Sequence, residues 1–349
     1  MLTLIALAVI TSAEKLLTVD ELISQPIPKE AQQLTGEALV NYVNSHQSLW
    51  KAEYRPGAEA YFKRRIMDSK FLEPLPGTER VQSIVSDGDE PPESFDARKH
   101  FKNCSSIISY IRDQSACGSC WAVSSASAIS DRICIQLNGK IKIQASDTDI
   151  LACCQDCGYG CNGGWTIRAF EYLRSEGVVS GGRYKEQGVC KPYAFYPCGR
   201  HDNQKYYGEC PLTGWDTPKC RKVCHRKYPK TWAKDKVWGS TAYTIAANEK
   251  LIRQEIMNYG PVVASMTVYT DFYSYKKGIY VHTSGKEEGG HAVKIIGWGK
   301  ENGTPYWLIA NSWNTDWGEN GGYFRILRGS NHCKIEGNVA AGKIRRYQT

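Results

Sequence analysis

The spacing of apolar positions predicts helices in the first half of the chain and strands in the second. Downstream of Cys120, apolar side chains recur near helical spacing, at Ala122, Val123, Ala126, Ile129, Ile133 and Leu137. Asn138 and Gly139 follow as a stop signal, so the pattern predicts a helix that begins at Cys120. A second helix is predicted over residues 248–259.

Runs rich in β-branched and aromatic residues predict strands at 262–269, 292–298, 306–310 and 323–327. Helices before strands favour an α+β protein with a cleft between two lobes. Residues 153–224 are rich in Gly, Cys, Pro and Tyr and have few periodic runs. We interpret that stretch as loops held by cross-links.

The N-terminal region has the pattern of a removable segment. Residues 2–10 form an apolar run followed by small residues up to Ala13, which predicts a signal peptide over 1–13 although no basic residue precedes the run. No later stretch reaches the roughly 18 apolar residues of a membrane span. Residues 14–90 lack cysteine, include a predicted helix over 36–50 with Trp50 on its apolar face, and lead into an acidic, proline-bearing linker. We predict a detachable segment over 14–90 and a working domain over 91–349; an ordinary small N-terminal domain is the alternative.

Composition narrows the class of protein. The 44 basic and 36 acidic residues leave a net charge of +8, which is far from a nucleic-acid-binding signature. The densest basic stretch, 219–236, is broken up by Cys, Pro and Trp, and we interpret it as a solvated surface. Of the fourteen cysteines, all but Cys333 lie between Cys104 and Cys224. That density is typical of an oxidising compartment and indicates a secreted or lysosomal protein. From the modest charge and the lack of a membrane-length apolar run, we expect neither nucleic-acid nor membrane partners.

Four residues of the chain, a cysteine, a histidine, an asparagine and a glutamine, are of the types that thiol catalysis requires. Cys120 at a helix N-terminus would be favoured as thiolate by the helix dipole. His291, after two glycines, is the candidate base, and the side-chain oxygen of Asn311 could accept the other imidazole proton while Trp313 shields that bond. The Gln114 amide and the Cys120 N–H could stabilise an oxyanion.

Each of these residues alone is weak evidence, because most cysteines in such a protein form disulfides and most histidines are structural. Together they match a known pattern: Cys-Gly-Ser-Cys-Trp at 117–121, then histidine and asparagine in that order. His291 and Asn311 follow Cys120 by 171 and 191 positions. Both separations exceed the usual range of about 130–150. An insertion is therefore expected before Cys224.

Further motifs carry a family resemblance. They are Ser-Phe-Asp-Ala-Arg at 94–98, the Ile-Ser-Asp-Arg-Ile-Cys run at 129–134, Cys-Asn-Gly-Gly at 161–164, Asp-Thr-Pro-Lys-Cys at 216–220 and the run 301–318. With these motifs the chain resembles papain-family cysteine proteases of the cathepsin B type, particularly nematode gut enzymes. The resemblance implies a papain-like fold with a helical left lobe, a β-barrel-like right lobe, an inhibitory prosegment and an occluding loop at about 190–210.

The resemblance also implies six disulfides and two free thiols, Cys120 and Cys333. The implied pairs are Cys104–Cys134, Cys117–Cys161, Cys153–Cys220, Cys154–Cys157, Cys190–Cys224 and Cys198–Cys210. The residues alone leave open a zinc site at Cys153, Cys154 and Cys157 with Cys161. No cofactor or metal is expected from the family likeness.

The likeness assigns substrate-binding roles as well. Gly163 and Gly164 would bond an extended substrate, and Ala292 and Trp313 would border it. The occluding loop of the family carries two histidines, where this chain has Arg200 and His201. We expect Arg200 to pair with Asp113 and so hold the loop closed to higher pH than two histidines would. The alternative is that Arg200 is a solvated charge on the loop. Asn338 aligns with the base of the S2 pocket, where the family often has glutamate, so apolar or aromatic P2 side chains are expected.

The predicted activity is hydrolysis of peptides and proteins through an acyl-thioester on Cys120, by both endopeptidase and dipeptidyl carboxypeptidase cleavage, in digestive or lysosomal protein breakdown. Expected partners are substrates, the chain's own propeptide and cystatin-like inhibitors, and a monomer is expected. Alternatives are a catalytically inactive binding protein, a disulfide-stapled structural protein and a transferase or ligase that uses the same acyl-enzyme.

Overall fold

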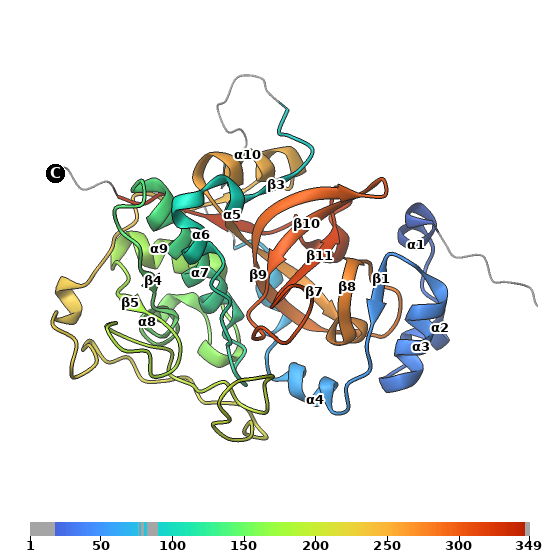
Figure 1. Ribbon diagram of the computed structural model, residues 1–349, viewed down its shortest axis with the longest axis horizontal. Coiled ribbons are helices and arrows are strands. Elements are labelled where there is room, and N and C mark those ends of the chain that lie inside the picture. The colour runs from blue at the N-terminus through green and yellow to red at the C-terminus, as the bar shows by residue number, and fades with distance from the viewer. Residues whose placement is uncertain (1–17, 76, 78–79, 82–89, 346–349) are drawn as a thin grey trace, which may run out of the picture.

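The computed structural model describes residues 18–75, 77, 80–81 and 90–345. The predicted signal peptide and most of the acidic linker lie outside these residues. Figure 1 shows a mainly helical half beside a half built on a twisted sheet, and the N-terminal segment lies along the sheet half and crosses below it. None of the helices within the described ranges is long and apolar enough to cross a membrane.

The helical lobe is organised around one buried helix. It contains α5 (Ala97–His100), α6 (Ser105–Ile108), α7 (Cys120–Gln136), α8 (Asp147–Cys153) and α9 (Thr166–Ser175), with the short strands β4 (Gln144–Ala145) and β5 (Ser180–Gly181). Every residue of α7 from Cys120 to Cys134 is buried. The helix predicted to begin at Cys120 is therefore present, and its serines and alanines let neighbouring elements pack closely on all sides.

The prediction of loops throughout 153–224 is wrong at α9. Ile167, Phe170 and Leu173 of this helix are buried. Arg168 and Glu171 lie on the opposite face, which is more exposed, and form an ion pair there. These apolar residues recur at three-residue spacing, which is a helical pattern. The abundant Gly and Cys on either side of this short run concealed that pattern.

The second lobe is a sheet on which most of the remaining elements pack. Within the described residues the strand order is β1-β8-β11-β10-β9-β7-β12-β6-β2, and β3 pairs with β9 off this path. The bounds are β1 (Trp50–Ala52), β2 (Arg80–Val81), β3 (Phe95–Asp96), β6 (Tyr243–Ile245), β7 (Val262–Tyr269), β8 (Tyr275–Tyr280), β9 (Glu287–Glu301), β10 (Thr304–Ala310), β11 (Tyr323–Leu327) and β12 (Val339–Ala341). This path is open, so the expected barrel-like lobe is an open sheet rather than a closed barrel. The predicted strands are all present, and β9 is longer than predicted because it pairs along nearly the whole of β7.

Helix α10 (Glu249–Tyr259) packs against this sheet and confirms the predicted helix over 248–259. Its N-cap is Asn248, whose side chain accepts a hydrogen bond from the Leu251 N–H. Such a cap satisfies one of the free N–H groups of the first turn.

The N-terminal segment forms α1 (Val19–Ser24), α2 (Lys29–Gln32), α3 (Gly36–His46), β1 and α4 (Ala58–Lys63). The helix predicted over 36–50 ends at His46, so its C-terminal part is wrong. The Gln47 side chain donates to Val43 O and accepts from Trp50 N–H, which closes the helix and turns the chain. Trp50 then begins β1, pairs with β8 and buries its ring, a contact that only the folded sheet provides.

Six disulfides staple the helical lobe, and they are the pairs that the family likeness implies. The structure pairs Cys104–Cys134, Cys117–Cys161, Cys153–Cys220, Cys154–Cys157, Cys190–Cys224 and Cys198–Cys210. Cys120 and Cys333 are the free thiols. The zinc alternative is wrong, because each of its four cysteines is in a disulfide. No cluster of His, Cys, Asp or Glu within the described ranges could hold a metal.

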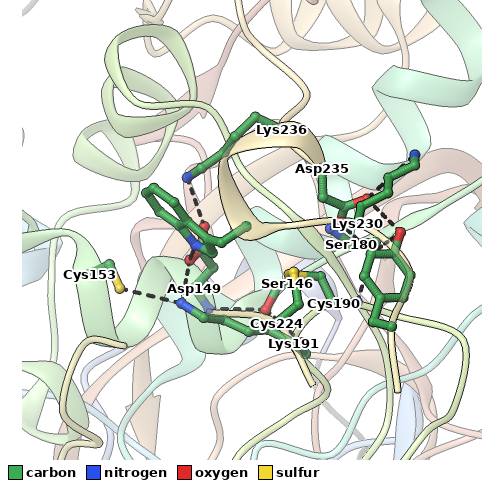
Figure 2. Close-up of a disulfide and its surroundings, with 12 residues drawn as sticks. Ser146, Asp149, Cys153, Ser180, Cys190, Lys191, Cys224, Lys230, Asp235 and Lys236 are labelled. Carbon is green, nitrogen blue, oxygen red and sulfur yellow. Dashed lines mark hydrogen bonds and ion pairs between the residues drawn. A yellow bond between two sulfur atoms is a disulfide. The ribbon is translucent and has the colours of Figure 1, made fainter. Parts of the chain in front are cut away.

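A buried ion cluster fixes the basic stretch 219–236 to α8. Figure 2 shows Lys191 and Lys236 directed at Asp149, near the Cys190–Cys224 disulfide, at 2.7 and 3.2 Å. Burial raises the pKa of Asp149, but the two ammonium charges outweigh burial and hold its pKa below the ordinary value. The other lysines and arginines of this stretch, including Lys222 and Lys227, are exposed, as the prediction of a solvated surface requires, whereas Asp235 is buried.

Candidate active site

Cys120 is the first residue of α7 and is fully buried. The Cys117–Cys161 disulfide and a hydrogen bond of 2.8 Å from Gly118 N–H to Cys161 O hold the turn before the helix. A side chain at Gly118 would collide with the Cys161 and Ile66 carbonyl oxygens, so this close approach requires glycine. The Cys-Gly-Ser-Cys turn therefore places the thiol at the N-terminal end of α7, at the boundary between the two lobes.

His291 lies on β9, the strand of the sheet lobe that packs against α7. Its Nε2 lies 2.8 Å from Asn311 Oδ1, just after β10. An amide oxygen can only accept, so Nε2 carries the proton and Nδ1 is left as an acceptor. Within the described residues Nδ1 has no hydrogen-bond partner. The imidazole is therefore held in the tautomer that a general base requires.

The aromatic cover predicted for this pair is present. The Trp313 ring is stacked on the His291 ring with centroids 4.7 Å apart, and Trp313 is 1% exposed. Trp313 also packs against Phe62 of α4, with ring centroids 4.7 Å apart. The His291–Asn311 bond is thus shielded from water, and the N-terminal segment contributes to the shield.

The thiol and the imidazole are both neutral in this closed form. Burial raises the pKa of Cys120 to about 12, although hydrogen bonds from the N–H groups of Ala292 and Trp121 act in the opposite direction. Burial also lowers the pKa of His291 to about 4. Burial of the sulfur thus opposes, in this form, the thiolate that the helix N-terminus is expected to favour.

Residues 65–72 of the N-terminal segment are what covers the site. Met67 exchanges two backbone hydrogen bonds with Gly290, each 2.8 Å long, immediately before His291. The Asn338 side-chain N–H donates to Leu72 O at 3.2 Å. The segment therefore runs through the cleft from α4, past the histidine, to Asn338.

Gln114 points its amide group into the same cleft. Its Nε2 donates to Arg65 O at 2.7 Å and to Cys117 O at 2.8 Å, and its Oε1 accepts from Ser312 Oγ at 2.7 Å. Ser312 thus fixes which end of the amide faces the cleft. Of the two carbonyl oxygens that accept from this amide, Arg65 O belongs to the covering segment.

Gly163 and Gly164, which were expected to bond an extended substrate, face different neighbours. A side chain at Gly163 would collide with the Phe71 ring, whereas one at Gly164 would meet the Trp121 ring. Within the described residues, neither glycine forms a backbone hydrogen bond with the covering segment. Asp68 N–H donates instead to Asn162 O at 3.4 Å, a residue that the sequence reasoning did not single out.

The prediction that Arg200 pairs with Asp113 is wrong. Arg200 is exposed and lies over the Tyr206 ring, 4.8 Å from its centroid. His201 takes the place instead, with Nε2 3.3 Å from Asp113 and Nδ1 3.0 Å from Asp316. The Cys198–Cys210 disulfide closes the base of the loop just before these residues, and of two consecutive side chains only the second is directed inward.

His201 therefore clamps the loop between two carboxylates. Its side chain is 4% exposed. Burial lowers the pKa of His201, but the hydrogen bond to Asp316 and the charges of Asp113 and Asp316 outweigh burial and raise it above the ordinary value. Asp316 was not among the predicted residues, although it lies in the run 301–318 that carries the family likeness.

The fold gives Asn338 and Glu336 different surroundings. Glu336 accepts from the Trp307 ring N–H at 2.9 Å and from Gly329 N–H at 2.6 Å, so its carboxylate is engaged away from the segment. Asn338 is buried beside Leu72, and its Oδ1 has no partner within the described residues. Asn338, rather than Glu336, contacts the chain that occupies the cleft.

Comparison with known proteins gives a family for this geometry. The model of the papain family cysteine protease domain matches residues 91–343. A cathepsin B-like cysteine proteinase 1 of Ostertagia ostertagi is 48% identical over 93% of this chain and 94% of its own length. A cathepsin B-like cysteine proteinase 4 of Caenorhabditis elegans is 50% identical over 88% and 92%. Among solved structures, procathepsin B S9 of Trypanosoma congolense has a TM-score of 0.75 and 38% identity over 89% of this chain and 98% of its own. The chain belongs to the papain family of cysteine proteases and is a cysteine peptidase of the cathepsin B-like type.

Proposed function

We propose that Cys120, His291, Asn311 and Gln114 are the catalytic residues of a zymogen that hydrolyses peptide bonds. The observation that carries this assignment is the His291–Asn311 bond of 2.8 Å, which leaves Nδ1 as an acceptor. The next residue on β9, Ala292, hydrogen-bonds the Cys120 thiol through its backbone. Cys120 gives its proton to His291 Nδ1, and the sulfur attacks the peptide carbonyl carbon. The C–N bond then breaks, and the imidazolium passes that proton to the leaving amine. In the second step water gives a proton to His291 and attacks the thioester carbon, the C–S bond breaks, and the proton returns to the Cys120 sulfur. Gln114 Nε2 and the Cys120 N–H stabilise the oxyanion in both steps.

The N-terminal region, residues 14–90, is the removable inhibitor of this enzyme, and the mature chain begins near Pro91. The family match that starts at residue 91 and the segment bonded along the cleft support this division. The signal peptide over 1–13 directs the chain to secretion or to lysosomes, where it digests protein as a monomer controlled by cystatin-like inhibitors. Six disulfides support an oxidising compartment.

The loop at 190–210 adds dipeptidyl carboxypeptidase activity to endopeptidase activity. A loop clamped beside the cleft blocks long substrates, and His201 can meet a terminal carboxylate there. Because partners raise the pKa of His201, the clamp is complete at pH below about 6.5. It is lost as the pH rises through the higher pKa of the folded form. Exopeptidase cleavage should therefore dominate under acidic conditions.

Replacement of His201 tests this part of the proposal. In the processed enzyme, His201→Ala is expected to raise cleavage of C-terminally amidated peptides about tenfold at pH 5, because the loop no longer excludes them. Release of dipeptides from free-carboxylate peptides should fall. Arg200→Ala is the matched control and should change neither rate, since the Arg200 side chain is exposed and stacks on the Tyr206 ring rather than on either carboxylate. Mass spectrometry of the products measures both. Equal behaviour of the two variants would contradict the clamp.

Asn338 sets a second expectation, at the S2 pocket. An amide offers a basic side chain little charge attraction, so the processed enzyme should prefer apolar or aromatic P2 residues to arginine. Asn338→Glu should raise kcat/KM for arginine at P2 about tenfold without improving leucine. Fluorogenic dipeptide substrates that differ only at P2 measure the ratio. A wild-type preference for arginine would overturn the assignment.

A further inference from the structure

One carboxylate, that of Glu288, faces the occupied cleft close to the candidate base. Glu288 lies on β9, three residues before His291, and its side chain is 7% exposed. Its Oε1 accepts from Thr270 Oγ at 3.1 Å, and its Oε2 lies 3.4 Å from the ammonium of Lys63. Lys63 is the last residue of α4 and lies in the N-terminal segment, two residues before the stretch 65–72 that covers the site. The positive partner of this nearly buried carboxylate thus comes from the segment.

Glu288 lines the same hollow as the turn that carries the nucleophile. A cavity of about 700 Å³ is bordered by Glu288, Lys63, Ile66, Cys117, Gly118 and Trp215. The next residue, Gly289, touches the segment directly, since a side chain there would lie 2.8 Å from Met67 O and 3.0 Å from Ile66 Cδ1. Glu288 is therefore a wall of the cleft in which the segment lies.

The path of the segment shows on which side of the reacting bond Glu288 lies. Arg65 O meets the oxyanion donor Gln114, and Leu72 lies seven residues later at Asn338, the P2 side. Lys63 precedes Arg65 and so lies on the opposite side of the donor. That side receives the leaving amine of a substrate.

Building on the proposed function, we infer that Glu288 selects substrates with lysine or arginine as the first residue on the leaving-amine side. When the segment departs, Glu288 loses the ammonium of Lys63 and keeps its hydrogen bond from Thr270 Oγ. A basic substrate side chain replaces that ammonium, whereas an apolar one leaves the carboxylate without a counter-charge. The enzyme thereby cleaves before basic residues.

Glu287 provides a matched control on the same strand. It is exposed, it is one residue further from His291, and its Oε1 accepts from Ser69 Oγ at 2.9 Å. Glu287→Gln and Glu288→Gln remove the same formal charge from adjacent positions. A general electrostatic effect on basic substrates would appear in both variants, while a specific pocket would appear only in the second.

The test uses the processed enzyme and C-terminally amidated peptides that differ only in the first residue after the cleaved bond. With lysine or arginine there, kcat/KM should exceed that for norleucine about tenfold. Glu288→Gln should bring this ratio near one, and Glu287→Gln should keep it. No preference in the wild type, or equal loss of preference in both variants, would overturn the inference.

A fluorogenic substrate whose leaving group is not an amino acid separates this inference from the proposed function. Turnover of that substrate by wild type and Glu287→Gln, without discrimination among the peptides, would sink the role of Glu288 alone. No turnover of either kind of substrate would mean that the proposed hydrolase itself is wrong, and the inference would fall with it.

Discussion

Replacement of Cys120 by serine is expected to lower kcat/KM of the processed enzyme for peptides by about 10⁴-fold or more. The hydroxyl keeps the size of the side chain and its place at the start of α7. The serine hydroxyl does not lose its proton to His291, because the partner of that imidazole is the neutral Asn311 and not a carboxylate. The loss is therefore chemical, and circular dichroism and thermal unfolding should remain close to those of the wild type.

The other free thiol supplies the control for this substitution. Cys333 is partly buried on the 3-10 turn at 332–334, and burial raises the pKa of its thiol well above the ordinary value. Cys333→Ser should keep activity and still take up one equivalent of a thiol-directed inhibitor, whereas Cys120→Ser should take up none. Labelling that followed Cys333 instead, with peptide cleavage intact in Cys120→Ser, would refute the assigned nucleophile.

In the intact chain, the Cys120 thiol is expected to react with iodoacetamide at least about 10³-fold more slowly than in the processed enzyme between pH 5 and 8. A pKa of about 12 means that very little of the buried thiol is thiolate at these pH values. Departure of residues 65–72 admits water and allows a thiolate–imidazolium pair to form. The alkylation rate of Cys120, followed by peptide mass spectrometry before and after cleavage near residue 90, measures the difference.

Loosening the segment without cutting the chain provides an independent check. Phe71 is 1% exposed, packs edge-on against Trp165 and covers Gly163. Phe71→Ala removes this contact and should speed alkylation of Cys120 in the intact chain. Lys70→Ala alters an exposed neighbour and should not. Equal alkylation rates in intact and processed chains would show that the segment does not control the thiol.

These expectations depend on the N-terminal segment as much as on the enzyme lobes. The segment takes one backbone pairing from β9 at Gly290, one amide donor from Gln114 and one from Asn338. Its α4 also supplies Phe62 to Trp313 and Lys63 to Glu288. One stretch of chain therefore blocks the nucleophile and neutralises a cleft carboxylate together.

Local pattern was sufficient for several elements. The strands over 262–269 and 323–327 and the helix from Cys120 were predictable because their spacing and residue types favour one local conformation. Trp50 was misplaced because its strand exists only when β8 lies beside it. Helix α9 was missed because its ten residues lie between Gly- and Cys-rich turns.

The sequence by itself determined the chemistry: a thiol at a helix start, a histidine after two glycines, an asparagine before tryptophan, and enough cysteines for six cross-links. These are short-range patterns, and the residue types alone carry their meaning. Only the tertiary structure decided the state of that chemistry. Whether Arg200 or His201 faces Asp113 depends on how a disulfide-closed loop is oriented. Whether the Cys120 thiol ionises depends on water, which a segment some fifty residues earlier in the chain excludes from the cleft.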